Sequence, residues 1–247
     1  MIDPKVFSKL QNKGIITHVG LKHTDFESLD QLKSLGVATK IKTDTIVEQI
    51  VESENILDNF LAKIADGGEV TVPVDITLNT PIMIAKDIVL DLNYCTIKSA
   101  QDVFDISNDA KLIINGTGKI IAATNNTCSW CAVFAHDNAE VIINGGEYSV
   151  GAPANDYNDL IYAKDNAKII INDGIYKADG TVRNDGVSFM LNLKDNTNAT
   201  ITLNGGKFEK FNPAAANTEP GGPYNFITDG YESIKIDDYY NVIKINE

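Results

Sequence analysis

Four segments of the sequence repeat one pattern, in which a short run rich in isoleucine ends at an asparagine. They read AKLIINGTGKI at 110–120, AEVIINGGEY at 139–148, AKIIINDGIY at 167–176 and ATITLNGGKF at 199–208. With Asn93 before them and Asp237 as a degenerate sixth member, the anchors fall at positions 93, 115, 144, 172, 204 and 237, so the steps are 22, 29, 28, 32 and 33 residues. Strand-and-turn units at this spacing predict a solenoid, here a parallel β-helix.

Alternation along each run predicts which side chains face the core. In the repeated strand the inward sets are Ala110, Leu112, Ile114; Ala139, Val141, Ile143; Ala167, Ile169, Ile171; and Ala199, Ile201, Leu203. A preceding strand has the inward pairs Phe104/Ile106, Val133/Ala135, Ile161/Ala163, Leu191/Leu193 and Phe226/Thr228. A following strand has the inward residues Ile120, Tyr148, Tyr176 and Phe208. The sequence therefore predicts three short strands per coil, with coils stacked about 4.8 Å apart.

The asparagine that ends each strand is interpreted as architecture. Asparagine and glycine tolerate the left-handed backbone conformations that a sharp corner requires. Asparagine side chains stacked on one another can also form hydrogen bonds along the column. We therefore expect these residues to hold the corner of the coil, and we assign them no catalytic role.

Charge and composition exclude several classes of partner. The chain has 247 residues and a net charge of −13, which argues against nucleic acid because phosphate binding requires clustered Lys and Arg. No run of about 18 apolar residues exists to cross a membrane, and the first residues lack the apolar stretch of a secretory signal. Cys95, Cys128 and Cys131 are expected to be reduced thiols, because CSWC at 128–131 has no second pair to complete a zinc site. No metal and no cofactor is expected.

Residues 1–66 differ from the repeats. Apolar residues at helical spacing over 46–66, followed by Gly67-Gly68, predict an amphipathic helix that caps the first coil. Residues 1–45 hold seven lysines and five acids, a net charge of +2, against −15 for the remainder. A capping box at TDFE begins a helix there whose apolar face is Phe26, Leu29, Leu32 and Leu35. This segment is too small to bury a core alone, so we expect it to dock on another surface.

The stretch ADGGEVTVPVDITLNTPIMIAKDIVLDLNYCTI, followed by the asparagine coils, resembles the pectate-lyase-type β-helix superfamily over roughly residues 46–245. That resemblance implies a right-handed parallel β-helix over 67–247, in a fold that serves lyases, hydrolases, adhesins and viral fibres alike. A short acidic β-helix behind a small N-terminal segment also resembles the head fibres and capsid decoration proteins of tailed bacteriophages. This second resemblance implies a homotrimeric structural protein on the capsid surface of the virion, made in the host cytoplasm. It further implies that residues 1–45 bind the major capsid protein or another virion protein, and that the shaft attaches weakly to surface glycans.

Several large apolar side chains are predicted to face outward. The outward positions of the repeated strand are Asp91, Ile113, Ile142, Ile170, Thr202 and Lys235, and those of the preceding strand include Phe134 and Tyr162. Leaving such side chains in water is unfavourable. We therefore expect a subunit interface or a cover of the chain's own loops over Ile113, Ile142, Ile170, Phe134 and Tyr162. A strand facing shifted by one residue is the third interpretation, since it would remove the stripe.

Insertions gather at one corner of the coils, over 122–131, 150–159, 178–188 and 210–224. Within them Trp130, Tyr157 and Arg183 are candidate contacts to a ligand such as a glycan. A β-helix polysaccharide lyase or hydrolase is the alternative to a structural protein, and hydrolysis requires two carboxylates about 5–9.5 Å apart. The loop acids are expected to be solvated, so no catalytic residue is assigned. They are Asp156, Asp159, Asp165, Asp179, Asp185 and Asp195.

Overall fold

The computed structural model describes residues 56–124, 131–150, 159–177 and 189–245. The chain divides into two compact units, Met1–Asn55 and Ile56–Glu247, and all of the described residues belong to the second. Some of the predicted site residues lie outside the described residues. They are the docking face Phe26, Leu29, Leu32 and Leu35, and the loop contacts Trp130, Tyr157 and Arg183.

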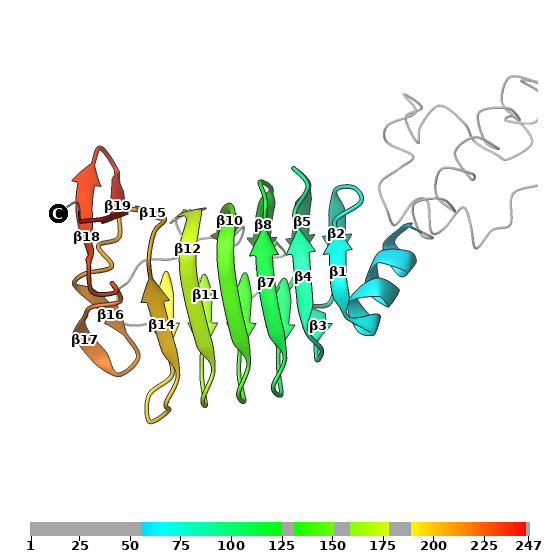
Figure 1. The fold of residues 1–247 in the computed structure, drawn as a ribbon, viewed down its shortest axis with the longest axis horizontal. Helices are drawn as coiled ribbons and strands as arrows, with labels where there is room; N and C mark the ends of the chain where they lie inside the picture. The colour runs from blue at the N-terminus through cyan, green and yellow to red at the C-terminus, as the bar shows by residue number, and fades with distance from the viewer. Residues whose placement is uncertain (1–55, 125–130, 151–158, 178–188, 246–247) are drawn as a thin grey trace, which may run out of the picture. The chain divides into compact units, whose positions relative to one another are not determined.

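The second unit is mainly β-structure and forms a β-solenoid, in which strands stack in parallel from coil to coil (Figure 1). Each coil offers three strand positions, which we call the first, second and third face. The first face contains β1 (Gly68–Thr71), β4 (Ile88–Asp91), β7 (Lys111–Asn115), the start of β10 (Glu140–Val150), the start of β12 (Lys168–Tyr176) and β14 (Thr200–Leu203). The second face contains β2 (Ile76–Leu78), β5 (Thr96–Ser99), β8 (Lys119–Ala122), the ends of β10 and β12, and β15 (Lys207–Glu209). The third face contains β3 (Ile82–Ile84), β6 (Phe104–Ile106), β9 (Val133–Ala135), β11 (Ile161–Ala163) and β13 (Leu191–Leu193).

The columns predicted to face the core are buried. Val141 pairs with Leu112 of the coil before it and with Ile169 of the coil after it, and none of the three is exposed to solvent. On the second face the predicted inward aromatics stack at centroid distances of 5.1 and 4.7 Å, in the order Tyr148, Tyr176, Phe208. Burying each side chain of this size contributes about 1.5–3 kcal/mol. The continuous core thus comes from like residues repeated at each level.

One predicted inward pair lies on another face, although the burial of Phe226 is confirmed. Phe226 is buried, but Ile227 beside it forms a parallel bridge with Leu203, which belongs to the first face. Phe226 and Thr228 therefore do not extend the third-face column. The chain has passed through the turn over 210–224 and returns to the solenoid at a different face.

The asparagine corner between the first and second faces forms the predicted ladder. Each side-chain Nδ2 donates to Oδ1 of the preceding coil at 2.8–2.9 Å, along Asn115, Asn144, Asn172 and Asn204. Glycine is needed beside the ladder because the corners of successive coils lie close together. A Cβ at Gly145 would lie 2.6 Å from the carbonyl oxygen of Gly116, closer than side chains tolerate.

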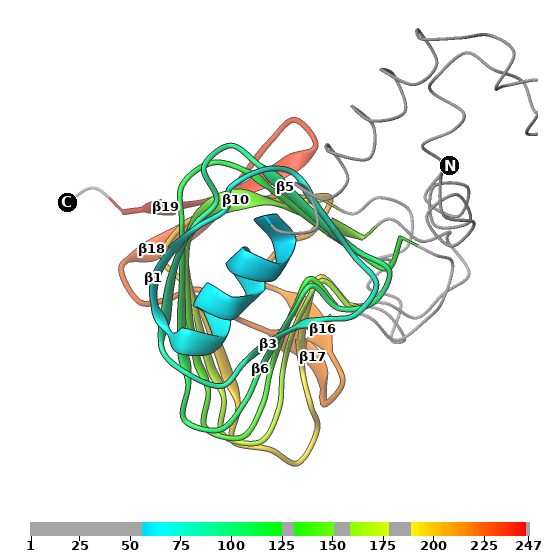
Figure 2. The ribbon, with the colours of Figure 1, turned by 90° about the vertical axis from the view of Figure 1, so that its right-hand side faces the viewer.

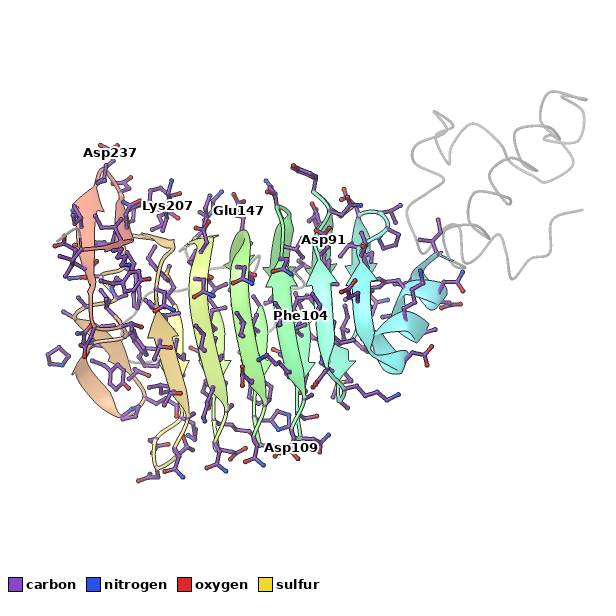
Figure 3. The ribbon with its side chains drawn as sticks, in the orientation of Figure 1. Asp91, Phe104, Asp109, Glu147, Lys207 and Asp237 are labelled. Atoms are coloured by element: carbon purple, nitrogen blue, oxygen red, sulfur yellow. The ribbon has the colours of Figure 1, made fainter. Side chains whose placement is uncertain are left out.

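A second ladder, which was not predicted, holds the corner between the third and first faces. Its side chains are linked by hydrogen bonds of 2.9–3.0 Å along Asp109, Asn138, Asn166 and Asn198. Asp109 is labelled at this corner in Figure 3. Residues here adopt positive φ angles of 56–61°, at Asn108, Asp137, Asp165 and Asn196, where Asn and Asp are the side chains best tolerated. Both sharp corners of the coil are therefore fixed by amide and carboxylate side chains.

The two ends of the solenoid are closed differently. Residues 56–66 form a helix that lies across the first coil (Figure 2) and buries Phe60 and Ile64 in the common core. The first half of the predicted cap, residues 46–55, lies outside the described residues. At the other end β18 (Tyr231–Ile236) and β19 (Tyr239–Lys244) form an antiparallel hairpin, whose β19 pairs antiparallel with β15. A short hairpin of β16 (Ala216–Thr218) and β17 (Gly221–Tyr224) precedes it.

The prediction of a sixth coil anchored at Asp237 is therefore wrong. Asp237 lies in the turn of the β18–β19 hairpin, at a φ of 53°, and the strands on either side run antiparallel. Its resemblance to the other anchors comes from turn chemistry, since Asp serves the same left-handed position in a hairpin as in a corner. The hairpin pairs with β15 of the last coil, whose strands would otherwise present a free edge.

Candidate functional site

The outward column of the third face changes its chemistry from coil to coil. Residues facing outward in register are Met83, Asp105, Phe134, Tyr162 and Asn192. Phe134 and Tyr162 stack with their ring centroids 5.4 Å apart and their planes 14° from parallel. The two ring faces are therefore turned toward each other, so that ring edges meet the solvent. This arrangement stabilises consecutive coils and is unlike the open ring face on which a sugar stacks.

Asp159 lies at the entrance to this face and is the most perturbed acid among the described residues. Its Oδ1 accepts a hydrogen bond from the backbone N–H of Phe189 at 2.8 Å, and its Oδ2 accepts one from Nδ2 of Asn192 at 2.7 Å. Burial raises the pKa of Asp159 to about 7, and the charge of Glu219 adds to the rise. The expectation that Asp159 is a solvated loop acid is therefore wrong, whereas Asp165 and Asp195 are exposed as expected.

Asn192 joins Asp159 to a second acid. Its Nδ2 lies 2.7 Å from Oδ2 of Asp159 and 3.4 Å from Oε1 of Glu219, so these two oxygens are no more than 6.1 Å apart. Its Oδ1 accepts hydrogen bonds from the hydroxyl of Thr218 at 2.9 Å and from the backbone N–H of Glu219 at 3.0 Å. One buried amide thus fixes β13 against the end of β16.

Glu219 completes this cluster at the solvent side. Its Oε2 accepts a hydrogen bond from Nζ of Lys194 at 2.7 Å, and its Oε1 accepts one from the hydroxyl of Tyr162 at 3.3 Å. We call Asp159, Tyr162, Asn192, Lys194 and Glu219 the third-face cluster. It contains one carboxyl group whose pKa is raised to about 7 and one partly exposed carboxylate, with one oxygen of each no more than 6.1 Å from the other.

Asp102 and Cys131 form a second buried contact beside the third face, nearer the first coil. Asp102 accepts a hydrogen bond from the backbone N–H of Cys131, and burial raises the pKa of Asp102 to about 6. Burial also raises the pKa of the Cys131 thiol well above its ordinary value, with the charges of Asp102 and Asp159 acting in the same direction. The buried thiol is consequently a poor nucleophile. Cys95 and Cys131 are both free, while Cys128 lies outside the described residues.

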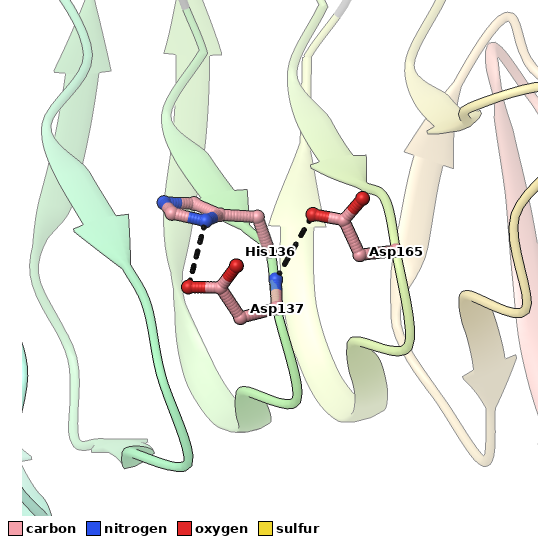
Figure 4. A group of neighbouring side chains, drawn as sticks. All are labelled: His136, Asp137 and Asp165. Atoms are coloured by element: carbon pink, nitrogen blue, oxygen red, sulfur yellow. Dashed lines mark hydrogen bonds and ion pairs between the residues drawn. The ribbon is translucent and has the colours of Figure 1, made fainter.

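Three side chains at the corner between the third and first faces approach the spacing of a metal site (Figure 4). One ligand atom each from His136, Asp137 and Asp165 lies within 4.8 Å of the others. However, Oδ2 of Asp137 accepts the backbone N–H of Asn108 at 2.9 Å, and Oδ2 of Asp165 accepts that of Asp137 at 3.1 Å. The first of these bonds is the main reason that the pKa of Asp137 is lowered. The two acids are therefore engaged in holding the corner.

His136 is tied to the solenoid by both ring nitrogens. Nε2 lies 2.9 Å from Oδ1 of Asp105, and Nδ1 lies 3.3 Å from Oδ2 of Asp137. Three ligands with this degree of internal bonding do not fit a structural zinc ion, which requires four. We assign no metal to this corner.

The structure separates residues that the sequence grouped together. Ile113, Ile142 and Ile170 form one column of the first face, and the three are partly exposed. Phe134 and Tyr162 belong to the third face, which faces another direction (Figure 2). The column on the first face continues to Val89, because the register pairs Val89 with Ile113 and Asp91 with Asn115. The expectation that Asp91 and Lys235 belong to this column is wrong.

The third-face cluster was missed because its members are distant in sequence. Asn192 occupies an outward strand position where any polar residue is expected, and Glu219 follows 27 residues later in a segment rich in Pro and Gly. The only local signal is an Asp two residues before the third-face strand, at Asp102 and again at Asp159.

Comparison with protein-family models, with curated proteins and with solved structures finds no match to this chain. Among the described residues, the structure contains no helix whose length and apolar character would let it cross a membrane.

Proposed function

We propose that this protein is a non-enzymatic structural protein of a virion, a head fibre or capsid decoration. In this proposal residues 1–45 anchor the chain to a capsid protein, the helix over 46–66 caps the first coil, and the right-handed β-helix projects outward. Weak attachment to a surface glycan belongs to the same proposal, as do the capsid-surface location and the absence of catalysis.

The observation that carries the proposal is that outward polar side chains form hydrogen bonds and ion pairs with those of neighbouring coils. The two ladders link coil to coil through side-chain hydrogen bonds of 2.8–3.0 Å, along four residues each. Ion pairs continue the same linkage on the first and second faces, between Lys111 and Glu140 at 2.6 Å and between Lys177 and Glu147 at 3.0 Å. Bonds between neighbouring coils stiffen a shaft, whereas an active site needs polar groups directed at a substrate.

The test is binding of the full chain to capsids of the source system. Changing Leu29 and Leu32 together to Asp removes the apolar face expected to dock, while Ile142→Asp changes a residue of the shaft. We expect the wild type and Ile142→Asp to co-sediment with capsids and the Leu29/Leu32 double variant to remain in solution. Equal retention of all three proteins would refute anchoring through residues 1–45.

One observation favours a second function, hydrolysis of a polysaccharide. Asp159 and Glu219 have oxygens no more than 6.1 Å apart, as their 2.7 and 3.4 Å distances to Nδ2 of Asn192 require, and a glycosidase needs two neighbouring carboxyl groups. Against it, both oxygens of each acid already accept hydrogen bonds from protein donors. Turnover assays on acidic glycans, with and without calcium, separate the functions: loss of turnover in Asp159→Asn would establish the enzyme, and no turnover in the wild type supports the structural role.

A further inference from the structure

Three outward columns run side by side along the first face. The middle column is apolar and consists of Val89, Ile113, Ile142 and Ile170, with Glu69 before it and Thr202 after it. On one side of it lies the asparagine ladder. On the other side lies a charged column with one residue per coil, in the order Asp87, Lys111, Glu140, Lys168. All four apolar side chains remain partly exposed, so this face presents an apolar rib flanked by polar groups.

The signs in the charged column alternate. Asp87 is negative, Lys111 positive, Glu140 negative and Lys168 positive, and the backbone registers place them on consecutive coils. Read in the opposite direction, such a column presents the opposite sign at every position. The charges of this column are therefore complementary to those of a second copy of the column that runs in the opposite direction.

We propose that the first face binds the first face of a second copy of this chain, with the two solenoids antiparallel. A two-fold axis parallel to the strands, between the coils of Lys111 and Glu140, brings each charged column against its own reverse. Lys111 then faces Glu140 of the second copy, and Asp87 faces Lys168. The apolar columns meet in the same way, with Ile113 against Ile142 of the second copy. Two sheets packed face to face in this manner are about 10 Å apart.

One form of parallel association, in which the first face of one chain meets the second face of its neighbour, is disfavoured by the same charges. In a threefold assembly of parallel shafts, the first face of one chain meets another face of its neighbour at the same level. On the second face, Lys119 and Glu147 lie in the coils of Lys111 and Glu140. First-to-second-face contact would therefore place lysine against lysine and glutamate against glutamate. The antiparallel pair avoids this, and it differs from the homotrimer expected from the resemblance.

The proposed interface between two first faces is small, so we expect the dimer to be weak. Six coils at about 4.8 Å and five residues at about 3.3 Å give a face of roughly 500 Å² per copy. Two such faces bury roughly 1,000 Å², at the lower limit of specific interfaces. We therefore expect a weak, reversible dimer that forms at high protein concentration.

A charge exchange in the full chain tests the pairing. Lys111→Glu places glutamate against Glu140 of the second copy, and Glu140→Lys places lysine against Lys111. Each variant alone should dimerise at least tenfold more weakly than the wild type in sedimentation velocity from about 5 to 500 µM. An equimolar mixture of the two should restore the dimer, because both contacts of the mixed pair again join opposite charges. Restoration shows that positions 111 and 140 lie at the interface. The antiparallel register rests on dimerisation of the wild type, since a parallel register would place Lys111 against Lys111 of the second copy.

Controls separate pairing from folding. Lys119→Glu makes the same charge change on the second face, where Lys119 lies 3.5 Å from Glu147, and it should leave dimerisation unchanged. Circular dichroism shows whether each variant is folded. The proposal is overturned by a monomeric wild type at all concentrations, which includes the case in which residues 1–55 cover the face. It is also overturned by a trimer, or by a mixture that stays monomeric. The inference goes beyond the proposed function, since capsid binding requires neither outcome.

Discussion

The first and third faces of the solenoid are built from the same coils but follow different rules. Across the three middle coils of the first face each outward column repeats one chemistry, namely apolar, alternately charged or amide. On the third face the outward column changes at every coil, from Met83 and Asp105 to Phe134, Tyr162 and Asn192. The chain enters the first face through a tight turn. It enters the third face after insertions of varying length.

The difference shows what a repeat can specify. In the three middle coils the turn before the first face has one length, so equivalent positions of the first face meet and a ladder is stable. Insertions remove that constraint at the entrance to the third face. Contacts there are between unlike residues, such as the amide of Asn192 and the carboxyl group of Asp159. Unlike contacts can bury acids with raised pKa values, which a ladder of identical acids would not tolerate.

The largest expected effect follows from replacing the centre of the third-face cluster. Asn192→Leu leaves Asp159 and the backbone N–H of Glu219 without the partners that they now have. Buried polar groups without partners are costly, so we expect unfolding to become easier by about 3 kcal/mol. Chemical denaturation measures this free energy. A change smaller than that of Asn172→Ala on the exposed ladder would contradict the distinction between the two faces.

A smaller effect is expected from the titration of Asp159. Its pKa is about 7 in the folded protein and 3.8 for an ordinary Asp, so the folded state binds the proton more tightly. The folded protein therefore gains stability as the pH falls from about 7 to 4 and loses it as the pH rises through 7. At about 1.4 kcal/mol per pKa unit the full difference would be about 4 kcal/mol. Because Asp159 is partly exposed, solvent screening reduces the expected gain to on the order of 2 kcal/mol. Denaturation midpoints at pH 4 and pH 7 measure it.

The matched variant is Asp159→Asn, which keeps an acceptor oxygen for Phe189 but cannot titrate. Its stability should vary less with pH over the same window than that of the wild type. Asp102, whose pKa is raised to about 6, will still contribute. An unchanged pH profile in Asp159→Asn would show that Asp159 is not the group responsible.

The sequence predicts contacts that follow from a short local pattern better than contacts between residues far apart in the chain. The inward columns and the ladder at Asn115 and Asn144 follow from local alternation, because each coil repeats the same short pattern. The contact between Asn192 and Glu219 depends on where the chain goes after β15. No local pattern encodes that path, so the third-face cluster was not predictable.

The C-terminal hairpin is a second feature that local sequence patterns do not predict. Its turn at Asp237 has the chemistry of a coil corner, and the residues around it alternate as a coil does. The direction of a strand depends on which neighbouring strand edge is free to pair with it. At the end of the solenoid that edge is β15, and β19 pairs with it antiparallel. A periodic pattern predicts the interior of a repeat better than its end.

On the first face, breaking the ladder should have a moderate effect. Asn172→Ala removes one hydrogen bond to Asn144 and one from Asn204, of 2.8 and 2.9 Å. Because Asn172 is exposed, water replaces both partners, so we expect a loss of about 1 kcal/mol. Thermal and chemical denaturation should agree on this value. A loss above about 3 kcal/mol would mean that the ladder is coupled to the core more strongly than its exposure suggests.

The smallest effect on stability is expected at the ion pair of Lys111 and Glu140, which is also the pair of charges on which the proposed dimer depends. Lys111 and Glu140 form an ion pair of 2.6 Å, but both side chains are well over a third exposed, at 39% and 38%. Exposed pairs of this kind contribute about 0.2–1 kcal/mol, so Lys111→Ala should change the free energy of unfolding by less than about 1 kcal/mol. The same variant removes both contacts to Glu140 in the proposed dimer and should weaken dimerisation measurably. Comparing unfolding at low protein concentration with sedimentation at high concentration separates the two roles, and a large loss of stability in the monomer would assign Lys111 to the fold instead.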